Sequence, residues 1–370
     1  MDKIHYRNLP VFFKIIFWPI KRLSFFYYRL IDTFTFTVWA EEGTESHSQQ
    51  KLLFAYAGLK PHKEYYARAA FQGAYEERYL GKIWLWAVTQ RQLKKRGYDC
   101  SFIVYEIDRY KQCFFWFRTV FRLPLWVVTE LDLRDRENSI EMDGRFKKAR
   151  KRIRQNQFTF EFTREEAEFK DFYFNMHVPY ITQKHDRAAL VETFEKLEKK
   201  FESGGLILAR KDGQVIAGNL IDSAAGKPRL YCLGVREGFE DLVKEGLISA
   251  MEYFGIVWAA KRHAPSVNLG DAMGFLDDGS LRHKMELGAR ITGACEPMYE
   301  LRFRFVHFTE ASKSFLIHHP FITVDKDRKL SAVFFADHPG ASSQGYKGLA
   351  RSKVYLFNDL ILNRRGNAAP

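Results

Sequence analysis

The segment VNLGDAMGFLDDGSLRHKMELGA, residues 267–289, joins a strand pattern to an acidic, glycine-rich turn and then to a single lysine. Alternating apolar residues at its start are typical of a buried strand, and glycines such as Gly270 allow backbone conformations that side chains forbid. Lys284 follows the turn, where an ammonium could lie over a reacting carbonyl or a phosphate. The segment therefore predicts one wall of a site, while the same pattern also fits an irregular loop with a solvated lysine.

The length and the charge of the chain limit the classes of protein to consider. A chain of 370 residues exceeds the usual size of one hydrophobic core, so we expect two lobes. Charged residues make up 28% of the sequence and hydrophobic residues 46%, as in an ordinary globular protein. The formal net charge of +13 favours an anionic partner: a nucleic acid, a phosphorylated ligand or an acidic membrane surface.

The four cysteines, Cys100, Cys113, Cys232 and Cys295, are scattered, with neither a CxxC pair nor a cysteine–histidine cluster. This pattern is typical of reduced, structural thiols in a cytoplasmic protein, and it predicts neither a metal site nor a redox motif. Cys232 belongs to the strand-like run LYCLGV, so we expect it to pack in a core.

Residues 1–50 are interpreted as an aromatic and basic leader followed by a linker. Lysine, arginine and proline interrupt the apolar run LPVFFKIIFWPIKRLSFFYYRLI (9–31), so it is a poor match to a spanning helix or to a cleaved signal peptide. Residues 1–30 could instead lie on the inner face of a membrane or dock on the protein's own body. The polar stretch AEEGTESHSQQ (40–50) predicts the linker.

The first lobe is expected over residues 51–140. Aromatic residues at helical steps predict one long helix over residues 63–96, ended by Gly97. Strand patterns occur in KLLFAYAGL (51–59), CSFIVYEI (100–107) and LWVVTELDL (125–133).

The second lobe is expected over residues 141–300. It begins with the basic helix GRFKKARKRIRQNQ (144–157), whose like charges repel, so either the packing of its apolar residues or an anionic ligand must stabilise it. Asp212-Gly213 predicts the turn of a hairpin. The remaining patterns predict strands at 158–163 and 228–235 and helices at 165–180, 187–203 and 242–261. Residues 301–370 return to strand signals, around a turn at 325–328 and again at 352–357.

Five segments of the second lobe, taken in order, resemble GNAT-like acyltransferases of the FemAB type over about Gly144 to Gly293. They are RFKKARKRIRQNQFTFEF, LILARKDGQVIAGNLI, YCLGV, EGLISAMEYFGIVWAA and NLGDAMGFLDDGSLRHKMELGA. The resemblance implies a mixed α/β fold of tandem GNAT-like lobes, with the C-terminal strands returning to the first lobe. It also implies the transfer of an acyl group to an amine, from acyl-CoA in some members and from aminoacyl-tRNA in others.

The resemblance assigns roles to individual residues of this chain. Lys284 matches a late lysine of the family that steadies a developing oxyanion or a substrate phosphate, although His283 and Leu287 stand where the family prefers aromatic residues. Lys244 and Gly246, in DLVKEGLIS, lie where related lobes cradle the pyrophosphate of the cofactor at a helix start.

Direct attack of an amine on a thioester or ester needs a proton acceptor and positive charge at the oxyanion. Asp271 or Asp277 could accept the proton, although both also fit turn positions. His177 and His185 lie at an expected substrate rim, where each could be an acid–base group or a surface residue. A substrate phosphate could be held by two pairs spaced four apart on the basic helix, Arg150 with Arg154 and Lys147 with Lys151.

Three functions remain open from the sequence. The first is an N-acyltransferase that uses acyl-CoA and a small-molecule or peptide amine, and the second is an aminoacyl-tRNA-dependent, amide-forming transferase. The third is a non-catalytic, membrane-peripheral binding protein in envelope or polysaccharide assembly, which the leader favours. A splayed pair of strands in the second lobe, with a channel ending near Lys284, would support transfer chemistry.

Overall fold

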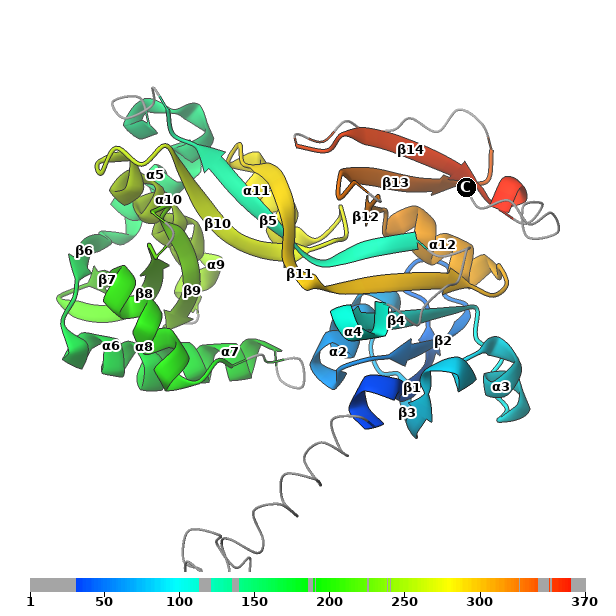
Figure 1. Cartoon of the computed structure of the whole chain (residues 1–370). Coiled ribbons are helices and arrows are strands. Elements are labelled where there is room, and N and C mark those ends of the chain that lie inside the picture. The colour runs from blue at the N-terminus through cyan, green and yellow to red at the C-terminus, as the bar shows by residue number, and fades with distance from the viewer. Residues whose placement is uncertain are drawn as a thin grey trace, which may run out of the picture.

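The computed structural model describes residues 31–112, 121–134, 140–185, 189, 191–224, 226–237, 239, 241–325, 327–338, 346 and 348–360. The fold is mixed α/β, as predicted, and it consists of two lobes joined by long strands (Figure 1). Within the described ranges, no helix combines the length and the apolar character needed to cross a membrane. The leader, residues 1–30, lies outside the described residues, so both interpretations of it stay predictions.

One mixed sheet of eleven strands runs through both lobes in the order β3-β1-β2-β4-β11-β5-β10-β9-β8-β7-β6. Three long strands form its centre and connect the lobes: β5 (Phe121–Asp132), β10 (Ser266–Met273) and β11 (Arg290–Phe305). All contacts between β5 and its two neighbours are antiparallel. The lobes are therefore tied together by backbone hydrogen bonds rather than by a flexible linker.

The first lobe places four strands on one side of this centre. Strands β2 and β4 are parallel to each other, whereas β1 is antiparallel to both β2 and β3. Its elements are β1 (Thr35–Thr44), β2 (Lys51–Ala57), α2 (Lys60–Ala70), β3 (Glu76–Trp84), a 3₁₀ turn (Leu85–Ala87), α3 (Gln90–Lys95), β4 (Phe102–Asp108) and α4 (Arg109–Gln112). The predicted strands at 51–59, 100–107 and 125–133 are confirmed.

Two predictions for the first lobe are wrong. Residues 63–96 do not form one helix, because β3 lies within this range and pairs with β1 over eight residues of register. Residues 40–50 are not all linker, since β1 continues to Thr44 and buries Glu41 completely. In both places tertiary pairing outweighs local composition. The predicted helix end at Gly97 is confirmed, with φ +89° just after α3.

The second lobe places β6 to β9 on the other side of the centre. The Asp212-Gly213 hairpin is confirmed, with positive φ at both residues and antiparallel pairing of the flanking strands. Its strands are β6 (Thr159–Thr163), β7 (Gly205–Lys211), β8 (Gln214–Asp222) and β9 (Arg229–Val235). Its helices are the 3₁₀ turns Ile140–Met142 and Gly144–Phe146, then α5 (Lys147–Asn156), α6 (Glu166–Phe172), a π-helical turn (Tyr173–His177), α7 (Val178–His185), α8 (Phe194–Ser203), α9 (Asp241–Lys244), α10 (Leu247–Ala260) and α11 (Gly279–Glu286).

Two of these helices differ in extent from the prediction. The helix expected over 187–203 begins only at Phe194, after Thr193. The helix expected over 242–261 is divided, because Gly246 has φ +97° and separates α9 from α10. The last part of the segment 267–289 is also helical rather than a loop: Asp278 caps α11 by accepting a hydrogen bond from the Leu281 N–H.

The C-terminal part of the chain returns to the first lobe, as predicted, through β11, which lies between β4 and β5. A separate three-stranded sheet follows α12 (Glu310–His318) and consists of β12 (Phe321–Val324), β13 (Leu330–Ala336) and β14 (Arg351–Leu356). The predicted turn at 325–328 joins β12 to β13, which are antiparallel. The domain boundaries at 50, 140 and 300 stay predictions.

The first lobe contains a completely buried lysine, Lys63 on α2. Its ammonium lies 2.9 Å from a carboxylate oxygen of Glu41, 2.7 Å from Glu77 and 3.2 Å from Glu64. Burial raises the pKa of Glu41 to about 7, because its charge is removed from water. The cluster connects α2 to β1 and β3, so it positions the helix whose first turn reaches the candidate site.

We predict that Lys63→Met lowers the free energy of unfolding by about 3–5 kcal/mol, because buried carboxylates then lose their cation. The measurement is chemical denaturation at about neutral pH. Lys60→Met is the matched control: Lys60 is half exposed and 3.6 Å from Glu77, so its loss should cost less than about 1 kcal/mol. Equal effects of the two substitutions would contradict the prediction.

Candidate functional site

Strands β9 and β10 of the second lobe are parallel neighbours that diverge. They pair at one register only, Asn268 with Arg229. Beyond it, β10 pairs with β5 as far as Met273, while β9 stays with β8 as far as Val235. Diverging strands leave a wedge in the sheet between them, as the transferase hypothesis expected.

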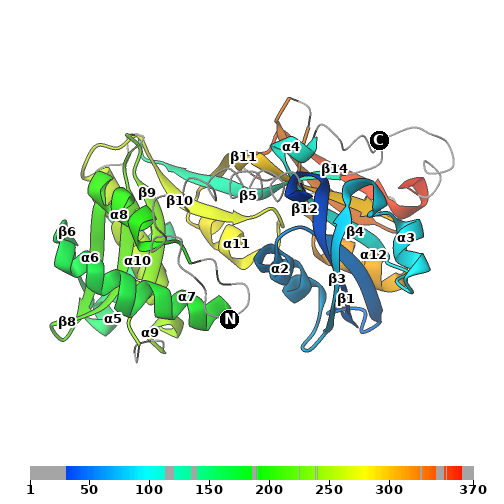
Figure 2. The same cartoon turned by 60° about the horizontal axis from the view of Figure 1, so that its bottom comes forward.

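A cavity of about 880 Å³ opens at this wedge and is lined by both lobes. The second lobe supplies Tyr231 and Asp271 from the diverging strands and Tyr180 from α7, while the first supplies His62 from α2. Figure 2 shows α2 and α7 on facing sides of the space between the lobes. The volume is that of a small-molecule site, and the walls combine aromatic and charged groups.

A β-bulge at Gly270 sets the direction of Asp271. The register between β10 and β5 shifts between Asn268 and Asp271, and Gly270 has φ +84°. The Gly270 N–H donates to the Asn268 side chain at 2.8 Å, and its carbonyl accepts from the Thr129 hydroxyl at 2.9 Å. The bulge is thus held on both sides, and a side chain at this left-handed position would be strained.

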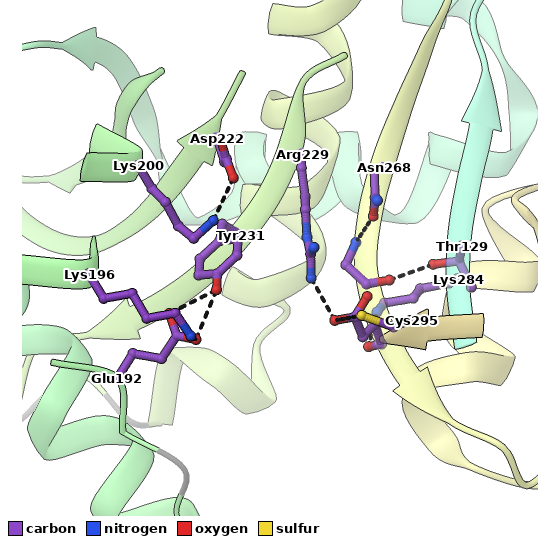
Figure 3. Close-up of polar contacts among 12 residues, drawn as sticks. Thr129, Glu192, Lys196, Lys200, Asp222, Arg229, Tyr231, Asn268, Lys284 and Cys295 are labelled. Carbon is purple, nitrogen blue, oxygen red and sulfur yellow. Dashed lines mark hydrogen bonds and ion pairs between the residues drawn. The ribbon is translucent and has the colours of Figure 1, made fainter. Parts of the chain in front are cut away.

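Asp271 combines one paired and one unpaired carboxylate oxygen (Figure 3). Its Oδ2 accepts from the Arg229 guanidinium at 2.6 Å and from the Cys295 thiol at 3.2 Å. Its Oδ1 is buried and has no hydrogen-bond partner within the described residues. A buried, unpaired carboxylate oxygen on a cavity wall can accept a hydrogen bond, or a proton, from a bound ligand.

Lys284 lies behind this wall rather than in it. The side chain is 5% exposed, and its Nζ donates to the backbone carbonyl of Asp271 at 2.7 Å. Burial lowers its pKa, because the charged form is removed from water. Lys284 on α11 and Arg229 on β9 therefore reach Asp271 from different elements. Of the two predicted catalytic residues, Asp271 therefore lines the cavity and Lys284 supports it.

Lys284→Met should change stability in a pH-dependent way. The folded-state pKa of Lys284 lies below its ordinary value of 10.5, so between these two values the unfolded chain binds more protons. The stability of the wild type relative to Lys284→Met should therefore rise as the pH increases towards 10.5. Paired denaturation curves from about pH 7 upwards measure this difference, and a pH-independent difference would contradict the burial of the ammonium.

A second polar cluster lines the cavity around Tyr231. The Tyr231 hydroxyl donates to the Glu192 carboxylate, at 2.9 and 2.8 Å from its two oxygens. Burial, followed by the hydrogen bond to Glu192, raises the pKa of this phenol. The Lys200 ammonium lies 4.1 Å from the centre of the ring and Arg229 lies 4.9 Å from it. Glu192 also forms an ion pair with Lys196, so the cluster contains both acidic and basic side chains (Figure 3).

Sequence reasoning missed His62, which the first lobe contributes to the cavity. Its Nδ1 lies 2.9 Å from Glu106, whose other oxygen accepts from the Tyr56 hydroxyl at 3.0 Å and from the Leu59 N–H at 2.8 Å. The segment KPHKE carries no motif, and His62 and Glu106 are far apart in sequence. Only the parallel pairing of β2 with β4 brings them together.

His177 and the two cysteines also line the cavity. His177 is 4% exposed, its Nδ1 lies 3.0 Å from the Leu233 carbonyl, and burial lowers its pKa. This is the pattern of a packed, hydrogen-bonded histidine. Cys232 packs partly against an apolar cluster around α6 and α8, as expected, and its burial raises the pKa of the thiol. Cys295, expected to be structural, instead contacts Asp271.

The other predicted site residues whose side chains the structure describes do not line the cavity. The basic residues of α5 face solvent, except that Arg150 is partly buried and donates to the Asp143 carbonyl at 2.8 Å. Lys244 is exposed and pairs with Asp241, and Gly246 is the residue before α10. The side chain of His185 lies outside the described residues. The predicted phosphate-binding residues are Lys147, Arg150, Lys151, Arg154 and His185.

The N-terminus of α10 nevertheless reaches the cavity through Ile248, which lines it. Gly246 leads into the helix, and the side chain of Arg152 from α5 packs against it, 3.0 Å from the position that a Cβ would take. The basic helix and the predicted cofactor turn are therefore neighbours. Their positive charge adds to that of the helix N-terminus.

No protein-family model matches the chain, and no curated protein matches it in sequence. Among solved structures, it is similar to a GCN5-related N-acetyltransferase from Sphaerobacter thermophilus, at 13% identity over 75% of this chain and 79% of that chain, with a TM-score of 0.35. It is also similar to FemX, at 11% identity over 68% and 80% of the two chains, with a TM-score of 0.36.

The C-terminal domain of a protein assigned as a lysylphosphatidylglycerol synthetase, from Agrobacterium fabrum, matches at 14% identity over 75% of this chain and 84% of that chain, with a TM-score of 0.35.

Proposed function

We propose that this protein is a GNAT-like acyltransferase that transfers an acyl group to an amine in the cavity between β9 and β10. The observation that carries the proposal is the unpaired Oδ1 of Asp271, buried on the wall of a cavity where two parallel strands diverge. Most buried carboxylate oxygens in proteins have a hydrogen-bond partner, and this one belongs to a residue that lines the cavity. A ligand N–H would satisfy this one.

The reaction follows from these groups. The amine nitrogen of the acceptor attacks the carbonyl carbon of the donor and forms a C–N bond, and the C–S or C–O bond to the leaving group breaks. Asp271 accepts the N–H proton at Oδ1, and the leaving thiolate or alkoxide takes up a proton to complete the balance. Arg229 keeps the other oxygen of Asp271 in place, and Lys284 holds the backbone carbonyl of the same residue.

The donor that we favour is acyl-CoA, with its phosphates near the N-terminus of α10, where Lys244 and Gly246 lie. The first lobe has a comparable parallel pair, β2 with β4, but there the Glu106 carboxylate already accepts from the Leu59 N–H at the start of α2. A donor phosphate would be repelled from that place. In the second lobe, Gly246 leads into α10, and Ile248 in the first turn of that helix lines the cavity.

An aminoacyl-tRNA donor is the second candidate, and the solvent-facing basic residues of α5 favour it. Lys147, Lys151 and Arg154 are exposed on α5, the helix whose Arg152 packs against Gly246, and they could contact a phosphate backbone. Binding through such contacts weakens steeply with salt. We therefore expect thermal stabilisation by bulk aminoacyl-tRNA to disappear at high salt if tRNA is the donor, and stabilisation by acetyl-CoA to persist if CoA is. A protein stabilised by neither donor would count against both candidates.

We predict that Asp271→Asn lowers the rate of amine acylation by about 10²–10⁴-fold, because the amide cannot accept the proton. Turnover is measured as thiol release from acetyl-CoA and longer acyl-CoAs with a panel of primary amines, and as loss of label from aminoacyl-tRNA. The matched control is Asp99→Asn, an exposed aspartate in the first lobe, which should leave the rate unchanged. If Asp271→Asn were as active as the wild type, the role of Asp271 would be refuted.

A further inference from the structure

The first lobe exposes a pair of tryptophans next to its edge strand. Trp84 is 47% exposed and Trp86 is 65% exposed, and their rings are stacked with centroids 5.2 Å apart. Tyr79, on the same edge strand, is 61% exposed. Large aromatic side chains that gather on a protein surface often mark a site of contact with another molecule or a membrane.

The segment that follows these tryptophans is basic. Helix α3 has the sequence QRQLKK and contains no acidic residue, and Arg91 and Lys95 on it are exposed. Neither forms an ion pair with any of the residues that the structure describes, whereas the neighbouring Lys94 pairs with Asp99. Aromatic rings beside unneutralised cations are the composition of a surface that binds an anionic interface.

The leader joins the folded part of the chain at the same place. Thr35, the first residue of β1, is paired with Trp84, and Lys82 on β3 pairs with Asp32. The sequence before Ile31 contains many aromatic residues and several lysines and arginines, with Asp2 as its one acidic residue. The aromatic and basic sequence of the leader therefore continues into the strand that pairs with Trp84.

We propose that this edge, defined by Trp84, Trp86, Arg91 and Lys95, is a docking surface for an anionic lipid bilayer. Charge complementarity decides between the candidate occupants. If the leader covered the tryptophans, its cations would face those of α3, and like charges repel. A bilayer that carries anionic lipid complements both stretches, and tryptophan rings are favoured at the membrane–water boundary.

The surface lies near the start of α2, where His62 lines the cavity. Residue Thr37, two positions along β1 from the partner of Trp84, accepts a hydrogen bond from the Gly58 N–H just before α2. Figure 1 shows β1, β3 and α2 together at one end of the first lobe. Docking there would bring the first-lobe wall of the cavity towards the bilayer, and it does not depend on the proposed reaction.

The test is flotation of the full chain with vesicles of phosphatidylcholine alone and of phosphatidylcholine with about 30 mol% phosphatidylglycerol. The wild type should float with the anionic vesicles and much less with the neutral ones. The double substitution Trp84→Ser/Trp86→Ser should lower the partition coefficient by about tenfold, and Arg91→Glu should lower it several-fold. Unchanged unfolding midpoints would show that the variants remain folded.

Two variants of the second lobe are the matched controls: Met142→Ser, which removes a side chain that is 83% exposed, and Lys199→Glu, which reverses an exposed charge. Both should float as the wild type does. The proposal is overturned if the tryptophan variant floats as well as the wild type, which would leave any binding to the leader alone. It is equally overturned if the wild type floats with neither kind of vesicle, or equally with both.

Discussion

The structure depends on β10 pairing along its length with β5 and at one register only with β9. Strand β10 pairs with β5 in an antiparallel ladder that runs from Ser266 to Met273. Its parallel pairing with β9 is limited to Asn268 and Arg229. Because a strand has two hydrogen-bonding edges, leaving β9 frees one edge of each strand. The cavity opens at that separation, and Asp271, which follows the bulge at Gly270, lies on its wall.

Side chains at the bulge, including the buried Lys284, form hydrogen bonds with backbone groups that the regular ladder leaves unpaired. At the bulge, Thr129, Asn268 and Lys284 take over hydrogen bonds that a regular ladder would have made. Lys284 can form this hydrogen bond because its long side chain extends from α11 to the bulge. Its ammonium stays close to carbonyl and carboxylate oxygens. Burying this charge is unfavourable, but the hydrogen bond that Lys284 donates to the Asp271 carbonyl keeps Asp271 in one orientation.

Each lobe contains a pair of neighbouring parallel strands, and the two pairs differ in how far they stay together. In the first lobe β2 and β4 remain paired over four residues of register, and Glu106, bound by Tyr56 and Leu59, fills the end of the junction. In the second lobe β9 and β10 separate, and the equivalent space opens into the cavity. The first lobe also contributes to the candidate site, because its His62 lines the same cavity as Asp271. The candidate site is thus assembled across the lobes.

Local patterns predicted much of this protein. Alternating apolar residues, the Asp212-Gly213 turn and the helical pattern of residues 242–261 depend on neighbours in sequence, so the strands of the second lobe and most of α10 could be predicted directly. Asp271 is a candidate from the sequence because it lies in the acidic, glycine-rich segment that also carries Lys284. The strand β3 was misread as helix, since only its pairing with β1 makes it a strand.

What the sequence by itself determined is therefore the mixed α/β class, the order of most elements, the strong positive charge and the neighbourhood of Asp271 and Lys284. Only the tertiary structure decided that Lys284 lies behind the wall, that the phosphate-binding candidates of α5 lie outside the cavity, and that His62, Arg229 and Cys295 meet at it. The reason is physical: short-range patterns fix periodicity and turns, whereas the separation of β9 from β10, which creates the site, depends on strands from distant parts of the chain.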